Sequence, residues 1–144
     1  MINVAKKSLL IDFTFRYGKI SDSVPLIPIR FIGSDGNSTQ IINAIFDSGA
    51  HELTIPKDLA DHLQYDIVEK KHKINTANGL CDAFSSKAHF CIGRGGREVE
   101  YVDEEICVME NCPAILMGIK PVFEDYLVII DAEDKKIKLN VKKK

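Results

Sequence analysis

The sequence lacks the features that most quickly assign a chain to a broad class. Its 144 residues carry a formal net charge of only −2, so no charge of one sign is present to attract nucleic acid or an anionic membrane. No apolar run approaches the roughly 20 residues of a membrane span. Residues 1–4 also lack the charged region and apolar stretch that open a signal peptide. We therefore expect a cytoplasmic protein that binds neither nucleic acid nor membrane.

Cysteine usage is also low and shows no metal-binding pattern. The four residues Cys81, Cys91, Cys107 and Cys112 could form two disulfides, but nothing indicates secretion and a domain of this size does not need them. His89 would share a strand face with Cys91. Structural zinc usually requires two close-spaced ligand pairs, and the remaining cysteines are spaced too loosely for a second pair. We expect reduced thiols, no metal and no cofactor.

Other catalytic patterns are incomplete. Residues 51–55 begin like a His-Glu-x-x-His zinc site but end in isoleucine. Ser48 lacks the Gly-x-Ser-x-Gly elbow because Phe46 stands where the first glycine is needed. The turn at residues 93–96 has neither the length nor the Lys-Ser/Thr ending of a phosphate-binding loop. These reaction classes are therefore set aside.

What the chain does contain is a series of short β-type runs separated by turn residues, which is typical of an all-β barrel or sandwich. The length suits one domain, residues 1–144. The turn at residues 34–38 predicts a hairpin between the strands on either side of it, and Asn78-Gly79 suits a tight hairpin turn. These runs predict strands at residues 7–16, 24–32, 41–46, 52–55, 66–74, 83–92 and 99–109.

Two local details refine this prediction. Pro25 and Pro28 should confine the strand at residues 24–32 to a sheet edge or a bulge, because proline donates no ladder hydrogen bond. Residues 57–63 carry an apolar stripe just after Pro56 and predict a short helix. A second short helix at residues 122–125 has weaker support.

The most informative stretch is Asp47-Ser48-Gly49-Ala50, which follows the apolar run at residues 41–46. It places one carboxylate at the end of a strand that otherwise belongs to the core. Ser48 supplies a hydroxyl beside that acid, and Gly49 lets the backbone turn tightly or approach a neighbour closely. A bland alternative is that Asp47 only caps a helix or a turn.

Residues 46–50, followed by Leu-Thr-Ile-Pro at residues 53–56, resemble the active-site signature of the retropepsin-like aspartic proteases. Residues 76–79 resemble the flap of these domains, and residues 115–118 resemble their strand of two hydrophobic residues followed by glycine. Residues 126–131 and 136–139 resemble the hairpin that usually ends bacterial members. The resemblance covers about residues 24–139, with residues 1–23 as an N-terminal strand or extension. It implies a closed or partly open retropepsin-like β-barrel with one or two short helices and one lobe per chain.

Aspartic protease chemistry needs two carboxyl groups that hold one water and share one proton. This chain has no second Asp-Ser/Thr-Gly, because Asp35-Gly36 lacks the middle hydroxyl residue and Asp131-Ala132 lacks both following residues. An active enzyme must therefore bring Asp47 from two copies together. A homodimer with twofold symmetry does this naturally.

The resemblance also implies the roles of individual residues. Asp47, Ser48 and Gly49 would be catalytic, and residues 75–80 would form the tip of a flap that closes over an extended polypeptide substrate. Ordinary core packing is an equally good explanation for the three pocket-wall candidates, Ala50, Ile115 and Met117, each taken singly. The full set of predicted substrate-binding residues is Ala50, Thr76, Ala77, Asn78, Gly79, Ile115 and Met117.

The sequence departs from the retroviral pattern after both landmarks. His51 and Glu52 stand where retroviral enzymes carry substrate-contacting acids, and Ile119 stands where they carry an arginine. Pro121 requires any helix to begin at or after it. An alternative function is therefore a catalytically weak or inactive module for dimerisation or peptide binding. The presence of Asp47, Ser48 and Gly49 together favours the enzyme.

Overall fold

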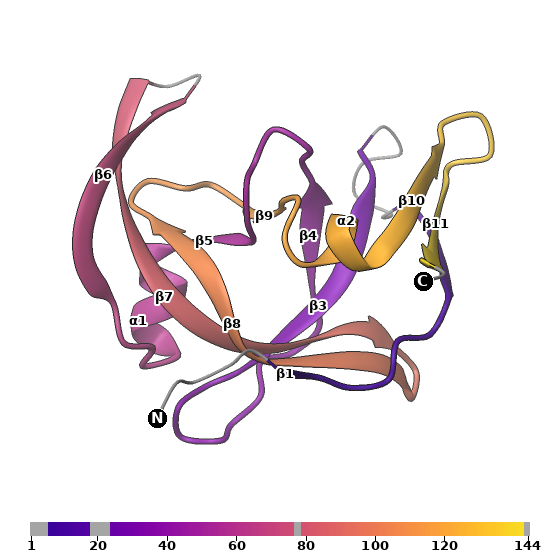
Figure 1. Ribbon diagram of the computed structural model, residues 1–144, viewed down its shortest axis with the longest axis horizontal. Coiled ribbons are helices and arrows are strands. Elements are labelled where there is room, and N and C mark those ends of the chain that lie inside the picture. The colour runs from indigo at the N-terminus through magenta and orange to yellow at the C-terminus, as the bar shows by residue number, and fades with distance from the viewer. Residues whose placement is uncertain (1–5, 18–23, 77–78, 143–144) are drawn as a thin grey trace.

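The computed structural model describes residues 6–17, 24–76 and 79–142, with residues 69–76 and 79–80 described by their backbone alone. Six strands close a barrel in the order β8-β5-β9-β4-β3-β7, and β7 pairs with β8 to complete it (Figure 1). These barrel strands are β3 (Leu26–Ile32), β4 (Ile42–Phe46), β5 (Thr54–Pro56), β7 (Gly79–Arg94), β8 (Arg97–Met109) and β9 (Ile115–Met117).

Two further strands extend the barrel sheet, and three form a separate sheet. β1 (Lys6–Lys7) pairs with β8, and β6 (Val68–Thr76) pairs with β7. The second sheet has the order β10-β11-β2, from Tyr126–Asp131, Lys136–Val141 and Phe13–Arg16. Within the described ranges, no helix is long and apolar enough to span a membrane. The predicted all-β class and barrel are confirmed.

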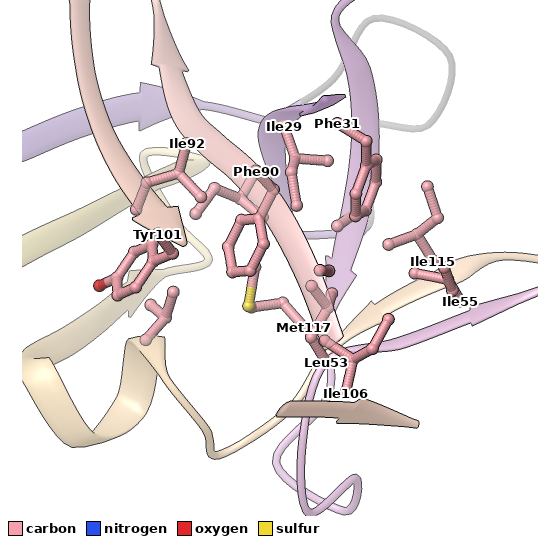
Figure 2. Close-up of a cluster of buried hydrophobic side chains, with 14 of the residues drawn as sticks. Ile29, Phe31, Leu53, Ile55, Phe90, Ile92, Tyr101, Ile106, Ile115 and Met117 are labelled. Carbon is pink, nitrogen blue, oxygen red and sulfur yellow. The ribbon is translucent and has the colours of Figure 1, made fainter. Parts of the chain in front are cut away.

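The core fills the barrel, extends to the second sheet and both helices, and contains side chains from strands that are far apart in sequence. β3 contributes Ile29 and Phe31, and the ring of Phe31 lies 6.0 Å from that of Phe90 on β7. Phe90 in turn stacks on Tyr101 of β8 at 5.1 Å (Figure 2). Complete burial of one such side chain contributes about 1.5–3 kcal/mol, so these residues hold the barrel strands together.

The N-terminal prediction of one strand over residues 7–16 is wrong. The chain forms β1 on the barrel and β2 in the second sheet, with an irregular connection between them. Hydrogen bonds to the second sheet account for the break: Tyr126 Oη–H donates to the Ile11 carbonyl, and Val141 N–H donates to Asp12 Oδ1, both at 2.8 Å. Tertiary contacts therefore override the local alternation of residues 8–12.

The prediction that prolines confine β3 to an edge or a bulge is also wrong, because β3 lies between β4 and β7 and pairs with both without a register shift. Pro28 faces Asn43 of β4, whereas pairing with β7 begins only at Ile29. At Pro28 the strand thus has a partner on one side alone, which removes the need for a second ladder donor.

The remaining local predictions agree with the structure within one to four residues at most ends. Helix α1 (Lys57–His62) buries Ala60 and exposes Asp58, and helix α2 (Val122–Asp125) begins directly after Pro121. The tight turn between β7 and β8 has positive φ at both Gly95 (65°) and Gly96 (81°), the conformation that a two-residue hairpin requires. Residues 53–55 do not alternate in exposure as predicted, because all three are buried.

Candidate active site

Asp47 lies at the end of β4, where the neighbouring strand β9 fixes its position. β4 runs parallel to β9 with Phe46 opposite Met117, and Asp47 N–H donates to the Met117 carbonyl at 3.0 Å. Phe46 also packs edge-on against Phe123 of α2, with ring centroids 5.7 Å apart. The strand end that carries the carboxylate is therefore held from two directions.

Backbone hydrogen bonds join the loop at residues 47–53 to residues 117–120. Ile119 N–H donates to the Ala50 carbonyl and Lys120 N–H to the His51 carbonyl, each at 3.0 Å. In the opposite direction, Leu53 N–H donates to the Lys120 carbonyl at 3.0 Å. The loop thus has little freedom to change shape.

Gly118 allows this close approach. A Cβ atom at this position would lie 2.6 Å from both the Ala50 and the Glu52 carbonyl oxygens, which are backbone atoms that cannot rotate away. Only glycine fits here without moving the loop. The predicted hydrophobic-hydrophobic-glycine strand therefore has a physical role beneath the Asp47 loop.

The carboxylate itself makes a local turn and remains reachable from solvent. Gly49 N–H donates to Asp47 Oδ1 at 2.9 Å, and Ala50 N–H donates to the Asp47 carbonyl at 3.1 Å. Asp47 is half-buried, whereas Ser48 and Gly49 are exposed. A hydroxyl, a backbone N–H and a carboxylate are therefore presented together on one surface loop.

The three predicted pocket walls differ in exposure. Ala50 is half-buried, but Ile115 is 8% exposed and Met117 is fully buried among the core side chains (Figure 2). Core packing therefore describes Met117 well. Leu116, the one side chain of β9 that is not buried, was not among the predicted site residues. Period-two alternation places it on the face opposite residues 115 and 117, but three hydrophobic residues in a row do not show which face lies outside the barrel.

The predicted flap corresponds to the hairpin of β6 and β7. Thr76 pairs with Gly79 across the turn, and Ala77 and Asn78 lie outside the described residues. The end of this hairpin, the Asp47 loop and the turn between β10 and β11 all extend toward the same side of the molecule (Figure 1). The predicted catalytic and flap segments therefore share one face.

The other predicted departures from the retroviral pattern lie beside this loop. His51 is exposed and Glu52 is half-buried, and Glu52 forms an isolated parallel bridge with Lys120. Lys120 Nζ lies 3.9 Å from Glu124 Oε1, an exposed pair that contributes little to stability. The backbone at residues 51–52 thus takes part in the contacts that hold the loop against residues 117–120, while the side chain of His51 is accessible.

Two of the thiols, those of Cys91 and Cys107, are poorly suited to nucleophilic or metal chemistry. Burial raises the pKa of both Cys91 and Cys107 to about 11, which keeps these thiols protonated at neutral pH. The described residues contain no group of three or more side chains placed to hold a metal ion. A groove of about 490 Å³ near Tyr65 and Lys87 contains none of the predicted site residues. The Asp47 loop is therefore the candidate site.

Comparison with known proteins supports the same fold. No protein-family model and no curated protein matches the chain. Among solved structures, a retropepsin-like aspartic protease from Rickettsia conorii matches 91% of this chain and 100% of its own length, with a TM-score of 0.63 and 19% identity. The retroviral protease-like domain of Ddi1 from Leishmania major matches 84% of this chain and 95% of its own, with a TM-score of 0.53 and 14% identity. The chain has a retropepsin-like fold.

Proposed function

We propose that this protein is an aspartic endopeptidase that cleaves extended polypeptides as a homodimer. The observation that carries the proposal is the position of Asp47-Ser48-Gly49 in a retropepsin-like barrel. Their loop is held by backbone hydrogen bonds to residues 117–120, a close approach that Gly118 permits. A peptide-binding module would need these hydrogen bonds for its fold, but it has no chemical need for an exposed carboxylate and hydroxyl on that loop.

The proposed chemistry uses Asp47 from both subunits. The ionised carboxyl takes a proton from water as the water oxygen attacks the peptide carbonyl, and the protonated carboxyl donates to the developing oxyanion. Two carboxyls about 3 Å apart share one proton, as aspartic proteases as a class illustrate, because two adjacent negative charges cannot both form readily. Ser48 would link the two loops across the axis through its hydroxyl, and Gly49 would bring its backbone close to the water.

The edge of the second sheet is a suitable interface for such a dimer. Among the described residues, β10 pairs with β11 alone, so its other edge presents unpaired backbone groups. Leu127, Ile129 and Ile130 on this strand are 55%, 40% and 44% exposed. An apolar edge strand of this kind is an aggregation hazard unless another chain covers it. It extends toward the same side as the Asp47 loop (Figure 1), so a second copy would cover both.

The proposed substrate lies extended between the Asp47 loops and the β6–β7 hairpins. Main-chain hydrogen bonds from the Thr76 and Gly79 region would hold it as an added strand. Ala50, Leu116 and the edge of Ile115 would form apolar walls beside the scissile bond. We therefore expect preference for apolar substrate side chains.

The proposal is tested with Asp47→Asn, which keeps the shape of the side chain and removes its titratable proton. The purified protein is incubated with a proteome-derived peptide library, with and without a statine-type transition-state mimic, and the new termini are sequenced. New termini should form with the wild-type chain and disappear with the variant or the mimic. Cleavage that persists in the variant would refute the catalytic assignment. An absence of cleavage in the wild-type chain would favour the binding module.

A further inference from the structure

Three of the four cysteines lie near the junction of the β6–β7 hairpin with the barrel. Cys81 is the third residue of β7 and is half-buried, Cys107 belongs to β8, and Cys112 lies in the turn between β8 and β9. Cys107 and Cys112 are almost fully buried. None of the proposed catalytic steps uses these thiols.

The end of the β7–β8 ladder brings Cys81 near Cys112. β7 and β8 pair in antiparallel order with Ala83 opposite Met109, and Glu110 N–H donates to the Asp82 carbonyl at 3.2 Å. Cys81 is one residue from this hydrogen bond, and Cys112 is two residues from it in the turn that follows β8. Facing residues in antiparallel strands have Cα atoms about 4.5–5.5 Å apart, and disulfides form when Cα atoms lie within about 4.4–6.8 Å.

The electrostatics agree with this proximity. Burial raises the pKa of the Cys112 thiol, and Cys81 adds to the rise; Cys112 in turn adds to the rise in the pKa of Cys107. The Cys112 thiol donates a hydrogen bond to the Ala114 carbonyl at 2.8 Å, which orients its side chain within the turn.

The same register separates Cys81 from the other two cysteines. Cys107 faces Ser85, which lies four residues along β7 from Cys81, a distance of about 13 Å at the rise of a strand. Cys91 faces Glu100, still further along the same ladder. A disulfide between Cys81 and either of these residues would require the ladder to break.

We propose that Cys81 and Cys112 form a regulatory disulfide site that joins the base of the β6–β7 hairpin to the β8–β9 turn under peroxide. The more accessible Cys81 thiolate attacks one peroxide oxygen, so that an S–O bond forms, the O–O bond breaks and water is released after protonation. The Cys112 sulfur then attacks the Cys81 sulfenic acid, an S–S bond forms, and the S–O bond breaks to release a second water. Overall, the two thiols lose two electrons, which one molecule of hydrogen peroxide accepts as it is reduced to two waters.

The disulfide would join the hairpin covalently to the turn that leads into β9 and Leu116. Because the link closes a loop of some 30 residues, it should stabilise the folded chain. If the proposed function is also correct, it should lower turnover as well, since the hairpin and the β9 wall could no longer move independently around a substrate.

The test maps disulfides after treatment with hydrogen peroxide and does not depend on peptidase activity. Trypsin together with a glutamate-specific protease, which cuts after Glu110, separates Cys107 from Cys112 for mass spectrometry. We expect a peptide linking Cys81 to Cys112 in both the wild-type chain and Asp47→Asn, with reversal by dithiothreitol. The melting temperature should rise by roughly 5–10 °C on oxidation.

Matched variants isolate the pair. Cys81→Ser and Cys112→Ser should each abolish the linked peptide and the rise in melting temperature, whereas Cys91→Ser should change neither. A link through Cys107 or Cys91, an intermolecular link, or overoxidation of Cys81 with Cys112 still reduced would overturn the proposal. Because Asp47→Asn is expected to form the same link, loss of the peptidase proposal and loss of the disulfide proposal give different results.

Discussion

Two aspartate turns flank β4, and they differ in ways that local sequence does not show. Asp35 lies in the turn before the strand and Asp47 in the loop after it. In each, carboxylate Oδ1 accepts the backbone N–H two residues further along, at 2.9 Å from Asn37 in one and from Gly49 in the other. The short-range chemistry of the two turns is therefore the same.

Their surroundings differ. The Asp35 turn is fully exposed, and a Cβ on Gly36 would meet no atom within 4 Å. The Asp47 loop lies against residues 117–120, where a Cβ on Gly118 would collide with two backbone carbonyls. Contact with a distant strand, rather than the Asp-Gly turn, is what distinguishes the candidate active site.

The largest expected difference between the turns is in activity. Asp47→Asn should lower kcat/KM by roughly 10²–10⁴-fold, because it removes the group that exchanges a proton with water. Asp35→Asn makes the same chemical change in the other turn and should leave kcat/KM unchanged. Equal losses in both variants, measured on one fluorogenic peptide, would mean that neither aspartate acts in catalysis.

The next largest effect concerns the glycines. Gly118→Ala should lower the free energy of unfolding by about 3 kcal/mol or more, because the loop must move away from the new methyl group. Gly36→Ala should cost only about 1 kcal/mol, since its φ of +86° is strained for alanine but the space around it is open. Urea unfolding measures both losses in free energy. Similar losses for the two variants would contradict the proposed role of Gly118 in the close approach of residues 117–120 to the Asp47 loop.

A smaller effect is expected at the proposed interface. Leu127→Lys should raise the dimer dissociation constant about tenfold or more, because each dimer loses two buried apolar side chains and gains two charges. Leu9→Lys changes another exposed leucine, 87% exposed, outside the second sheet and should have no such effect. Sedimentation equilibrium measures both constants. Activity at limiting concentration should fall with Leu127→Lys alone.

The smallest effect is a pH dependence at Asp35. The Asn37 backbone N–H holds the pKa of Asp35 below its ordinary value of 3.8. Because the folded-state pKa is lowered, the ionised carboxylate stabilises the fold above about pH 4, and this contribution is lost as the pH falls through the folded-state value. Wild type should therefore be slightly more stable than Asp35→Asn at neutral pH, and the difference should vanish near pH 2. A difference that grows in acid would contradict the sign.

Features set by neighbouring residues could be predicted from the sequence. Gly95 and Gly96 indicated a turn, and Pro56 with the apolar stripe after it indicated α1. The apolar run before Asp47 located the carboxylate at a strand end. Each of these signals acts over a few residues, so tertiary contacts did not change them.

Features set by distant contacts could not be predicted. Residues 8–12 alternate like a strand, but hydrogen bonds to the second sheet pull them out of the ladder. Pro28 indicated an edge, yet β7 begins to pair one residue later. Leu116 was missed because a hydrophobic run of three does not show which residue faces away from the barrel.

Mixing wild-type protein with Asp47→Asn tests the shared site most directly. A constant amount of wild-type chain is titrated with the variant well above the dimer dissociation constant, with excess substrate, after exchange has reached equilibrium. If each active centre needs Asp47 from two chains, activity should fall to about half at equal amounts and approach zero in large excess of the variant. Activity that stays constant per wild-type chain would contradict the account.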